Sequence, residues 1–162
     1  MSCIQNQTDV FWEAIFHCRW KTTLKNELAK IDVKSFENSS FEQVFSEIHK
    51  QLRHVHRLGP LAIYDVSSGI CRANKIRIDK IHIVGGGPKN AVKLLGITPK
   101  SYKIDGVKLD YVEVEDVIRV LKEKSINFKD TDDGDYFETF ICLWQKENKS
   151  KAPAKFLKEF SM

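Results

Sequence analysis

The sequence has few cysteines, and they are widely spaced: Cys3, Cys18, Cys71 and Cys142. None of them forms a CxxC pair, which excludes a zinc knuckle or a dithiol redox motif of the usual spacing. Most of them lie among apolar neighbours, a pattern typical of small buried thiols. We therefore expect no metal and no cofactor to depend on the cysteines.

Long apolar runs are also missing. No stretch approaches the roughly 18 apolar residues that a membrane span needs, and residues 1–7 show no basic segment of the kind that opens a secretory signal. We therefore expect a cytoplasmic protein without a membrane partner. A large excess of one charge is missing too. The 26 basic and 22 acidic residues give a net charge of +4, which permits nucleic-acid binding without requiring it.

What the chain does contain is apolar residues at helical spacing. It has 162 residues, of which 42% are hydrophobic and 30% charged, as in an ordinary globular protein. We predict a single helical domain over residues 1–147 and a lysine-rich, flexible tail over 148–162. The predicted fold is mainly α, a compact helical domain with a central helical hairpin and a minor β element.

The strongest helix signal begins at the serine pair 39–40. Either serine has Glu or Gln three residues later, the pattern of a capping box, and apolar residues then hold one face over 41–55. Gly59 and Pro60 interrupt this face, because glycine suits the end of a helix and proline the first turn of the next. A second helical face follows over 62–73. The two segments predict the helical hairpin.

Weaker patterns predict the other elements. Apolar spacing indicates further helices at 11–18, 24–31, 89–95, 114–121 and 136–144. A short strand is expected within 76–84. Asp105 and Gly106 stand between apolar residues within 102–111, which is a hairpin signal.

The turn of the predicted helical hairpin carries the first candidate site. Its residues are an apolar series followed by glycine: Leu52, Val55, Leu58 and Gly59. Over residues 52–82 this pattern resembles the helix-hairpin-helix proteins, in which a tight turn offers backbone N–H groups to a DNA phosphate. Arg57 stands where that motif has its first glycine. The resemblance implies phosphate contacts at Arg57, Gly59 and Leu61.

The same resemblance extends to the DNA glycosylases built on this motif. Their catalytic aspartate follows the hairpin glycine by about twenty residues, and Asp79 stands at that distance from Gly59. The lyase members carry a lysine at the position of Leu61, so a covalent amine mechanism is not supported. The resemblance then implies a monofunctional enzyme in which Asp79 activates water or stabilises a developing sugar cation.

The second candidate site is the glycine-rich turn at Gly85, Gly86 and Gly87, followed by Pro88 and Lys89. Three glycines between an apolar run and a helix can form a nest of N–H donors, and Lys89 adds a positive charge. The spacing matches neither the P-loop nor the GxGxxG fingerprint. An ordinary turn is the alternative interpretation.

No metal site is predicted. His49, Arg53 and His56 share a helical face, but two histidines seven residues apart lie ~10.5 Å apart along the axis and cannot chelate one ion unaided. The acidic segment 130–135 lacks the glycine and glutamate of an EF-hand loop. It is interpreted as a polar turn.

These patterns favour a non-enzymatic domain that contacts a nucleic-acid phosphate backbone through its two glycine-containing turns. The alternative is a protein-interaction module, such as an inhibitor, antitoxin or immunity-type partner from bacteria. The third interpretation is the glycosylase-like enzyme with Asp79.

Overall fold

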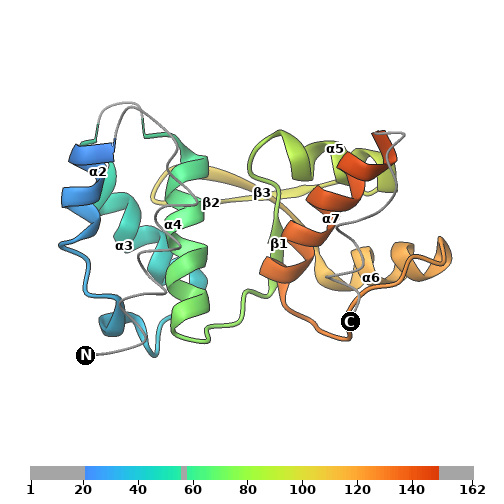
Figure 1. The fold of residues 1–162 in the computed structure, drawn as a ribbon, viewed down its shortest axis with the longest axis horizontal. Helices are drawn as coiled ribbons and strands as arrows, with labels where there is room; N and C mark the ends of the chain where they lie inside the picture. Colours follow the sequence, from blue (N-terminus) through green and yellow to red (C-terminus); the bar gives the residue numbers. More distant parts are fainter. Residues whose placement is uncertain (1–20, 56–57, 150–162) are drawn as a thin grey trace. The chain divides into compact units, whose positions relative to one another are not determined.

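The structure is a computed structural model that describes residues 21–55 and 58–149 (Figure 1). The chain divides into two compact units, Met1–Ile76 and Arg77–Met162, which are described separately. Helices dominate and a small sheet accompanies them, which confirms the predicted mainly helical fold with a minor β element. The single domain over 1–147 stays a prediction, since two compact units can still unfold as one. None of the described helices is long and apolar enough to cross a membrane.

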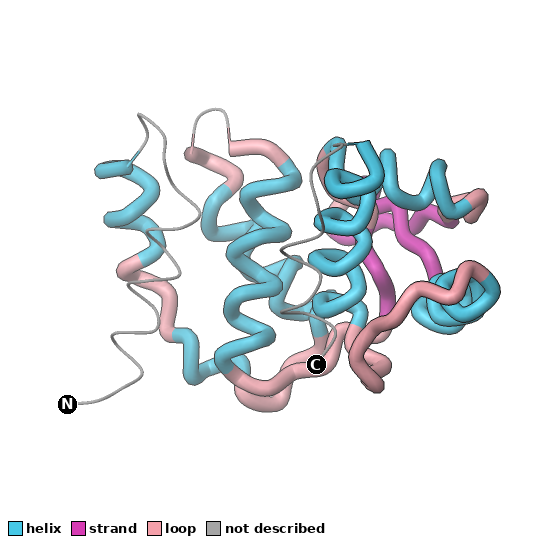
Figure 2. The backbone as a smooth tube through the Cα atoms, turned by 45° about the vertical axis from the view of Figure 1, so that its right-hand side comes forward, coloured by secondary structure: helices cyan, strands magenta, loops and turns pink. Residues whose placement is uncertain are grey.

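The first unit is helical throughout its described part (Figure 2). The helix predicted at 11–18 lies outside the described residues, as do residues 56–57. The elements, in chain order, are α2 (Lys21–Leu28), the 3₁₀ helix η1 (Val33–Phe36), α3 (Phe41–Leu52) and α4 (Pro60–Ala73).

Helix α3 begins where the sequence predicts it. The Ser40 hydroxyl accepts a hydrogen bond from the Gln43 backbone N–H (3.3 Å), and the Gln43 side chain accepts one from the Ser40 N–H (2.8 Å). This reciprocal pair is the predicted capping box. The apolar face is buried, with Phe45, Ile48 and Leu52 fully so. The regular helix ends at Leu52, short of the predicted limit at residue 55.

Helix α4 begins at Pro60 with Gly59 as its N-cap, as predicted. It packs against α3, where the rings of Phe41 and Tyr64 lie 5.8 Å apart. The connection between the two helices includes residues 56–57, so the hairpin itself stays a prediction. Gly59 has φ −86° and ψ 171°, an extended conformation that any residue adopts.

The second unit combines a three-stranded antiparallel sheet with three helices. The strand order is β1-β3-β2, so β3 is central. Asp105 and Gly106 join β2 to β3 with φ values of 47° and 80°, the positive values of a type I′ turn, which confirms the predicted β-hairpin. The elements are β1 (Lys80–His82), α5 (Gly86–Leu95), β2 (Lys100–Ile104), β3 (Val107–Glu113), α6 (Val114–Glu123) and α7 (Gly134–Lys149).

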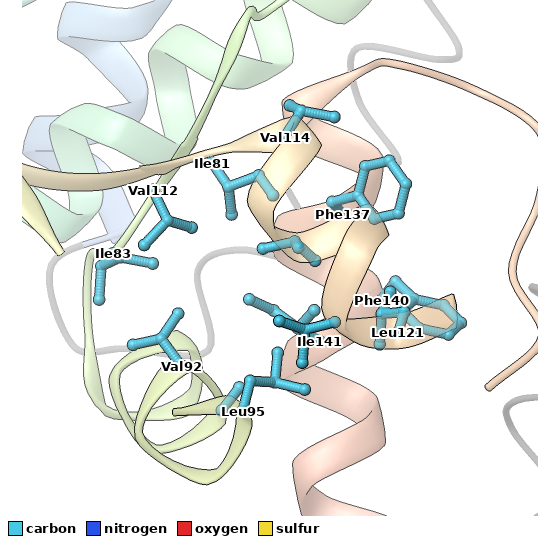
Figure 3. Packing of buried hydrophobic residues seen from close by; sticks show 13 residues of the cluster. Ile81, Ile83, Val92, Leu95, Val112, Val114, Leu121, Phe137, Phe140 and Ile141 are labelled. Carbon is cyan, nitrogen blue, oxygen red and sulfur yellow. The ribbon is translucent and has the colours of Figure 1, made fainter. Parts of the chain in front are cut away.

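The core of the second unit lies between one face of this sheet and α5, α6 and α7 (Figure 3). Ile81 and Val112 are register partners on that face. They belong to one buried cluster with Val92 of α5, Leu121 of α6 and Ile141 of α7. The apolar stripes predicted for the three helices therefore all serve one core.

Helix α7 approaches its neighbours closely at two glycines. At its start, the Gly134 N–H donates to the Ile78 carbonyl oxygen (2.7 Å), just before β1. Further along, Cys142 packs against Gly87 in the first turn of α5. A Cβ at residue 87 would overlap the Cys142 Sγ but would lie 3.6 Å from the Cys142 Cβ. The α5–α7 contact therefore depends on the small size of residue 87.

We expect Gly87→Ala to lower the free energy of unfolding by about 1–3 kcal/mol, because the added methyl overlaps the Cys142 sulfur. Adding Cys142→Ala removes that sulfur and should restore much of the loss. Urea melts of the two single variants and the double variant form a mutant cycle that measures the coupling. Additive losses would contradict the close approach.

Candidate functional site

The glycine-rich turn links β1 to α5 and takes its shape from Gly85. This residue has φ 89° and ψ 177°, a conformation that is essentially restricted to glycine. It is the N-cap of α5, and no side chain caps the helix there. The sequence predicted that the helix would open at Lys89. That boundary is wrong, because the helix already begins at Gly86.

The first turn of α5 therefore presents backbone donors at an exposed helix end. Gly85 and Gly86 are exposed, and Lys89 is exposed in the following turn. The N–H groups of the first helical residues have no partner within a helix, and they form the positive end of its dipole. Pro88 contributes no N–H, so the donors are those of Gly86 and Gly87. This arrangement can receive an oxyanion such as a phosphate.

A carboxylate lies beside this turn. The Ile83 N–H donates to the Asp110 carbonyl oxygen (2.7 Å), which extends the β1–β3 ladder toward the turn. The Asp110 side chain accepts a hydrogen bond from the Ser101 hydroxyl (2.6 Å) and lies 3.4 Å from the Lys108 ammonium. These contacts, the Ser101 bond first, lower the pKa of Asp110, and the more distant Lys89 adds to the effect. The carboxylate is thus ionised and already engaged by neighbours.

The other predicted phosphate contacts lie in the first unit. Gly59 and Leu61 are exposed, and Arg57 lies outside the described residues. A Cβ placed on Gly59 would meet no atom within 4 Å. Because the two turns belong to different compact units, each is considered as a separate contact.

Asp79, the residue on which the glycosylase interpretation depends, lies on the surface. Its side chain is 57% exposed, and both carboxylate oxygens lie within 3.0–3.1 Å of the Lys80 ammonium. An exposed, ion-paired carboxylate has none of the burial that adapts an acid for catalysis. Within the described residues, no group of three or more His, Cys, Asp and Glu side chains is placed to hold a metal ion.

A second cluster, not predicted from the sequence, lies on the other face of the sheet. It comprises Lys80, His82, Tyr102 and Tyr111, which the strand register places on one face. The His82 Nε2 lies 2.7 Å from the Tyr102 hydroxyl, and the Lys80 ammonium lies 5.7 and 5.9 Å from the centres of the Tyr102 and Tyr111 rings. Alternation of these residues along the strands was a signal that could have placed them together.

His82 is fully buried, and this determines its charge. Burial first, and the nearby Lys80 ammonium second, lower its pKa from 6.5 to about 3, while Asp79 acts in the opposite direction. The imidazole is therefore neutral at neutral pH. A base this weak does not abstract protons near pH 7.

Comparison with known proteins gives no match among family models, curated proteins or solved structures. Function is therefore inferred from the residues and contacts above.

Proposed function

We propose that this protein is a non-enzymatic binding domain that contacts the phosphate backbone of a nucleic acid. The observation that carries the proposal is the exposed N-terminus of α5, which no side chain caps and which Lys89 accompanies. A phosphate oxygen would accept hydrogen bonds from the Gly86 and Gly87 N–H groups, with Lys89 supplying charge. The Gly59 turn, with Arg57 and Leu61, is the second proposed contact.

Several features support this proposal. Gly85 adopts a backbone conformation that other residues rarely reach, so the turn that exposes the donors is specific to glycine. The donors belong to the main chain, and phosphate contacts of this kind carry no base information. We therefore expect binding that tolerates changes of sequence and weakens steeply with salt. A cytoplasmic location accords with this function and is part of the proposal.

Gly86→Val is the sharpest test of the N–H donors. A Cβ at residue 86 meets no atom within 4 Å, so the variant should fold while its side chain blocks the approach of a phosphate. We expect affinity for labelled oligonucleotides, measured by fluorescence anisotropy, to fall about equally for unrelated sequences. Gly86→Ala is the smaller control. Unchanged binding by Gly86→Val would remove this turn from the interface.

Lys89→Ala tests the charge. It should lower the slope of log affinity against log salt by about one, because one fewer counterion is released. Lys124→Ala, an exposed lysine at the end of α6, is the matched control and should leave the slope unchanged. Absence of any binding by the wild-type chain at ~50 mM salt, where the electrostatic contribution is strong, would contradict the proposed function. A protein-interaction module would then be the leading alternative.

Asp79→Asn separates the proposed function from the glycosylase interpretation. Removing an exposed negative charge should leave nucleic-acid binding unchanged or slightly stronger. A glycosylase that used Asp79 would instead lose release of damaged bases.

A further inference from the structure

Two lysines face each other directly across the β2–β3 hairpin. Lys103 and Lys108 are register partners, so their side chains leave the same face of the sheet with Cβ atoms about 4.5–5.5 Å apart. Both are exposed, Lys108 by 63% of its side chain. Like charges placed directly opposite each other destabilise a sheet. The hairpin thus carries a repulsion that its fold does not require.

Protection of a sheet edge is one role that both lysines can serve. Lysines on an edge strand discourage pairing with another chain, and Lys103 on β2 occupies such a position. Lys108, however, lies on β3, which is the central strand of the sheet. Strand β1 pairs with β3 only as far as Asp110, so the β1 side of β3 is unpaired at Lys108 and both lysines lie at open edges. Edge protection alone predicts no loss of oligonucleotide affinity when Lys103 is replaced, whereas a phosphate contact does.

The pair lies on the same side of the second unit as the glycine-rich turn. Strand β1 runs antiparallel to β3, and the Ile83 N–H donates to the Asp110 carbonyl oxygen. From Ile83 to Gly85 the chain therefore continues along β3 in the direction of Lys108. Helix α5 packs on the sheet face that contains Val112, and the alternation of β3 puts Lys108 and Asp110 on that face too. The lysine pair and the start of α5 therefore share one face and one end of the sheet.

Local carboxylates neutralise this surface only in part. Asp110 pairs with Lys108, and Asp105 stands in the turn beyond the pair. Among the described residues Lys103 forms no ion pair. With Lys89 included, three lysines stand against two aspartates, an excess of one positive charge, in addition to the positive end of the α5 dipole.

We infer that the pair Lys103 and Lys108 forms a further phosphate contact next to the Gly85 turn, so that one strand of a nucleic acid runs from the start of α5 across the β2–β3 hairpin. This inference rests on the proposed function and extends its site. A polyanion lying across the pair would remove the repulsion between the two ammonium groups. The lysine pair thus has two opposite effects. It lowers the stability of the free hairpin, and it raises the affinity for a polyanion.

Lys103→Glu tests both sides of this relation in the full-length chain. The new carboxylate faces Lys108 and forms an attractive cross-strand pair, so the thermal midpoint of unfolding should stay or rise. The affinity for a labelled single-stranded or duplex oligonucleotide at ~50 mM salt should fall on the order of tenfold. Lys103→Gln removes a single charge and should lower the log–log salt slope by about one.

Lys124→Glu is the charge-matched control. Helix α6 begins directly after β3, at the end of that strand opposite the hairpin turn (Figure 1), and Lys124 is the C-cap residue of this helix. Its variant should retain near wild-type affinity. Equal losses in Lys103→Glu and Lys124→Glu would overturn the inference, while a remaining effect of Gly86→Val would leave the proposed function standing.

Three further outcomes bear on the two proposals. A wild-type chain that binds no oligonucleotide at ~50 mM salt would overturn the proposed function together with this inference. Binding of wild-type protein to phosphatidylserine-containing vesicles but not to oligonucleotides, lost in Lys103→Glu, would assign the surface to a membrane and overturn the nucleic-acid contact. A rise in the wild-type thermal midpoint on addition of oligonucleotide, absent in Lys103→Glu, would support the phosphate contact at the lysine pair.

Discussion

Replacing Gly134 with alanine should destabilise the protein by about 3 kcal/mol or more. A Cβ at this position would overlap the Lys80 carbonyl oxygen and would lie 2.6 Å from the Lys80 carbonyl carbon and 2.9 Å from the Ile78 oxygen. These are backbone atoms beside and within β1, which cannot rotate away as a side chain can. The helix would have to move off the strand, and the hydrogen bond from the Gly134 N–H to Ile78 would be lost with it.

Urea melts followed by circular dichroism measure this loss. Gly86→Ala is the matched control, because it also adds one methyl at the first turn of a helix but meets no atom within 4 Å. That variant should be neutral or stabilised by a few tenths to 1 kcal/mol, since alanine restricts the unfolded chain. A Gly134→Ala protein as stable as Gly86→Ala would show that α7 does not begin against β1.

Acid should destabilise the protein well before its carboxylates titrate, because of His82. The folded-state pKa of about 3 lies below the ordinary value of 6.5. Between these two pH values the imidazole is protonated in the unfolded chain and neutral in the folded chain. Stability is complete above pH 6.5 and falls by up to about 1.4 kcal/mol per pH unit below it. Over the window from 6.5 to 3 the loss amounts to about 5 kcal/mol.

His82→Gln isolates this contribution. Glutamine does not titrate, and it can still exchange a hydrogen bond with the Tyr102 hydroxyl. Between pH 6.5 and 5, above the ordinary pKa values of Asp and Glu, the wild type should lose about 2 kcal/mol and the variant much less. Equal slopes for wild type and His82→Gln would show that the imidazole is hydrated.

Local signals in the sequence predicted the elements that depend on neighbouring residues. The capping box at Ser40 and Gln43 uses residues three apart, and the type I′ turn uses the adjacent Asp105 and Gly106. Both are confirmed, because their hydrogen bonds and dihedral angles are set within a few residues. The start of α5 was misplaced because glycines at Gly86 and Gly87 are poor helix formers. Gly87 packs closely against Cys142 of α7, a tertiary contact that the local sequence does not indicate.

The site residues missed by sequence reasoning depend on contacts between distant segments. The residues near Gly134 in the sequence do not indicate that β1 lies against it, because the polar residues before it are typical of an ordinary loop. The burial of His82 likewise follows from packing and not from its neighbours. The pair Lys103 and Lys108, in contrast, could have been predicted. Once Asp105 and Gly106 are recognised as a two-residue turn, counting outward from them pairs these lysines.

The contact between Gly134 and the backbone around β1 also constrains the order of events during synthesis. On the ribosome, β1 emerges before α7. The carbonyl groups of Ile78 and Lys80 therefore cannot contact Gly134 until residue 134 has been synthesised. Until then the apolar face with Ile81 and Val112 lacks its α7 cover. A nascent chain halted before Gly134 would therefore expose an adhesive surface, which is the kind of intermediate that chaperones recognise.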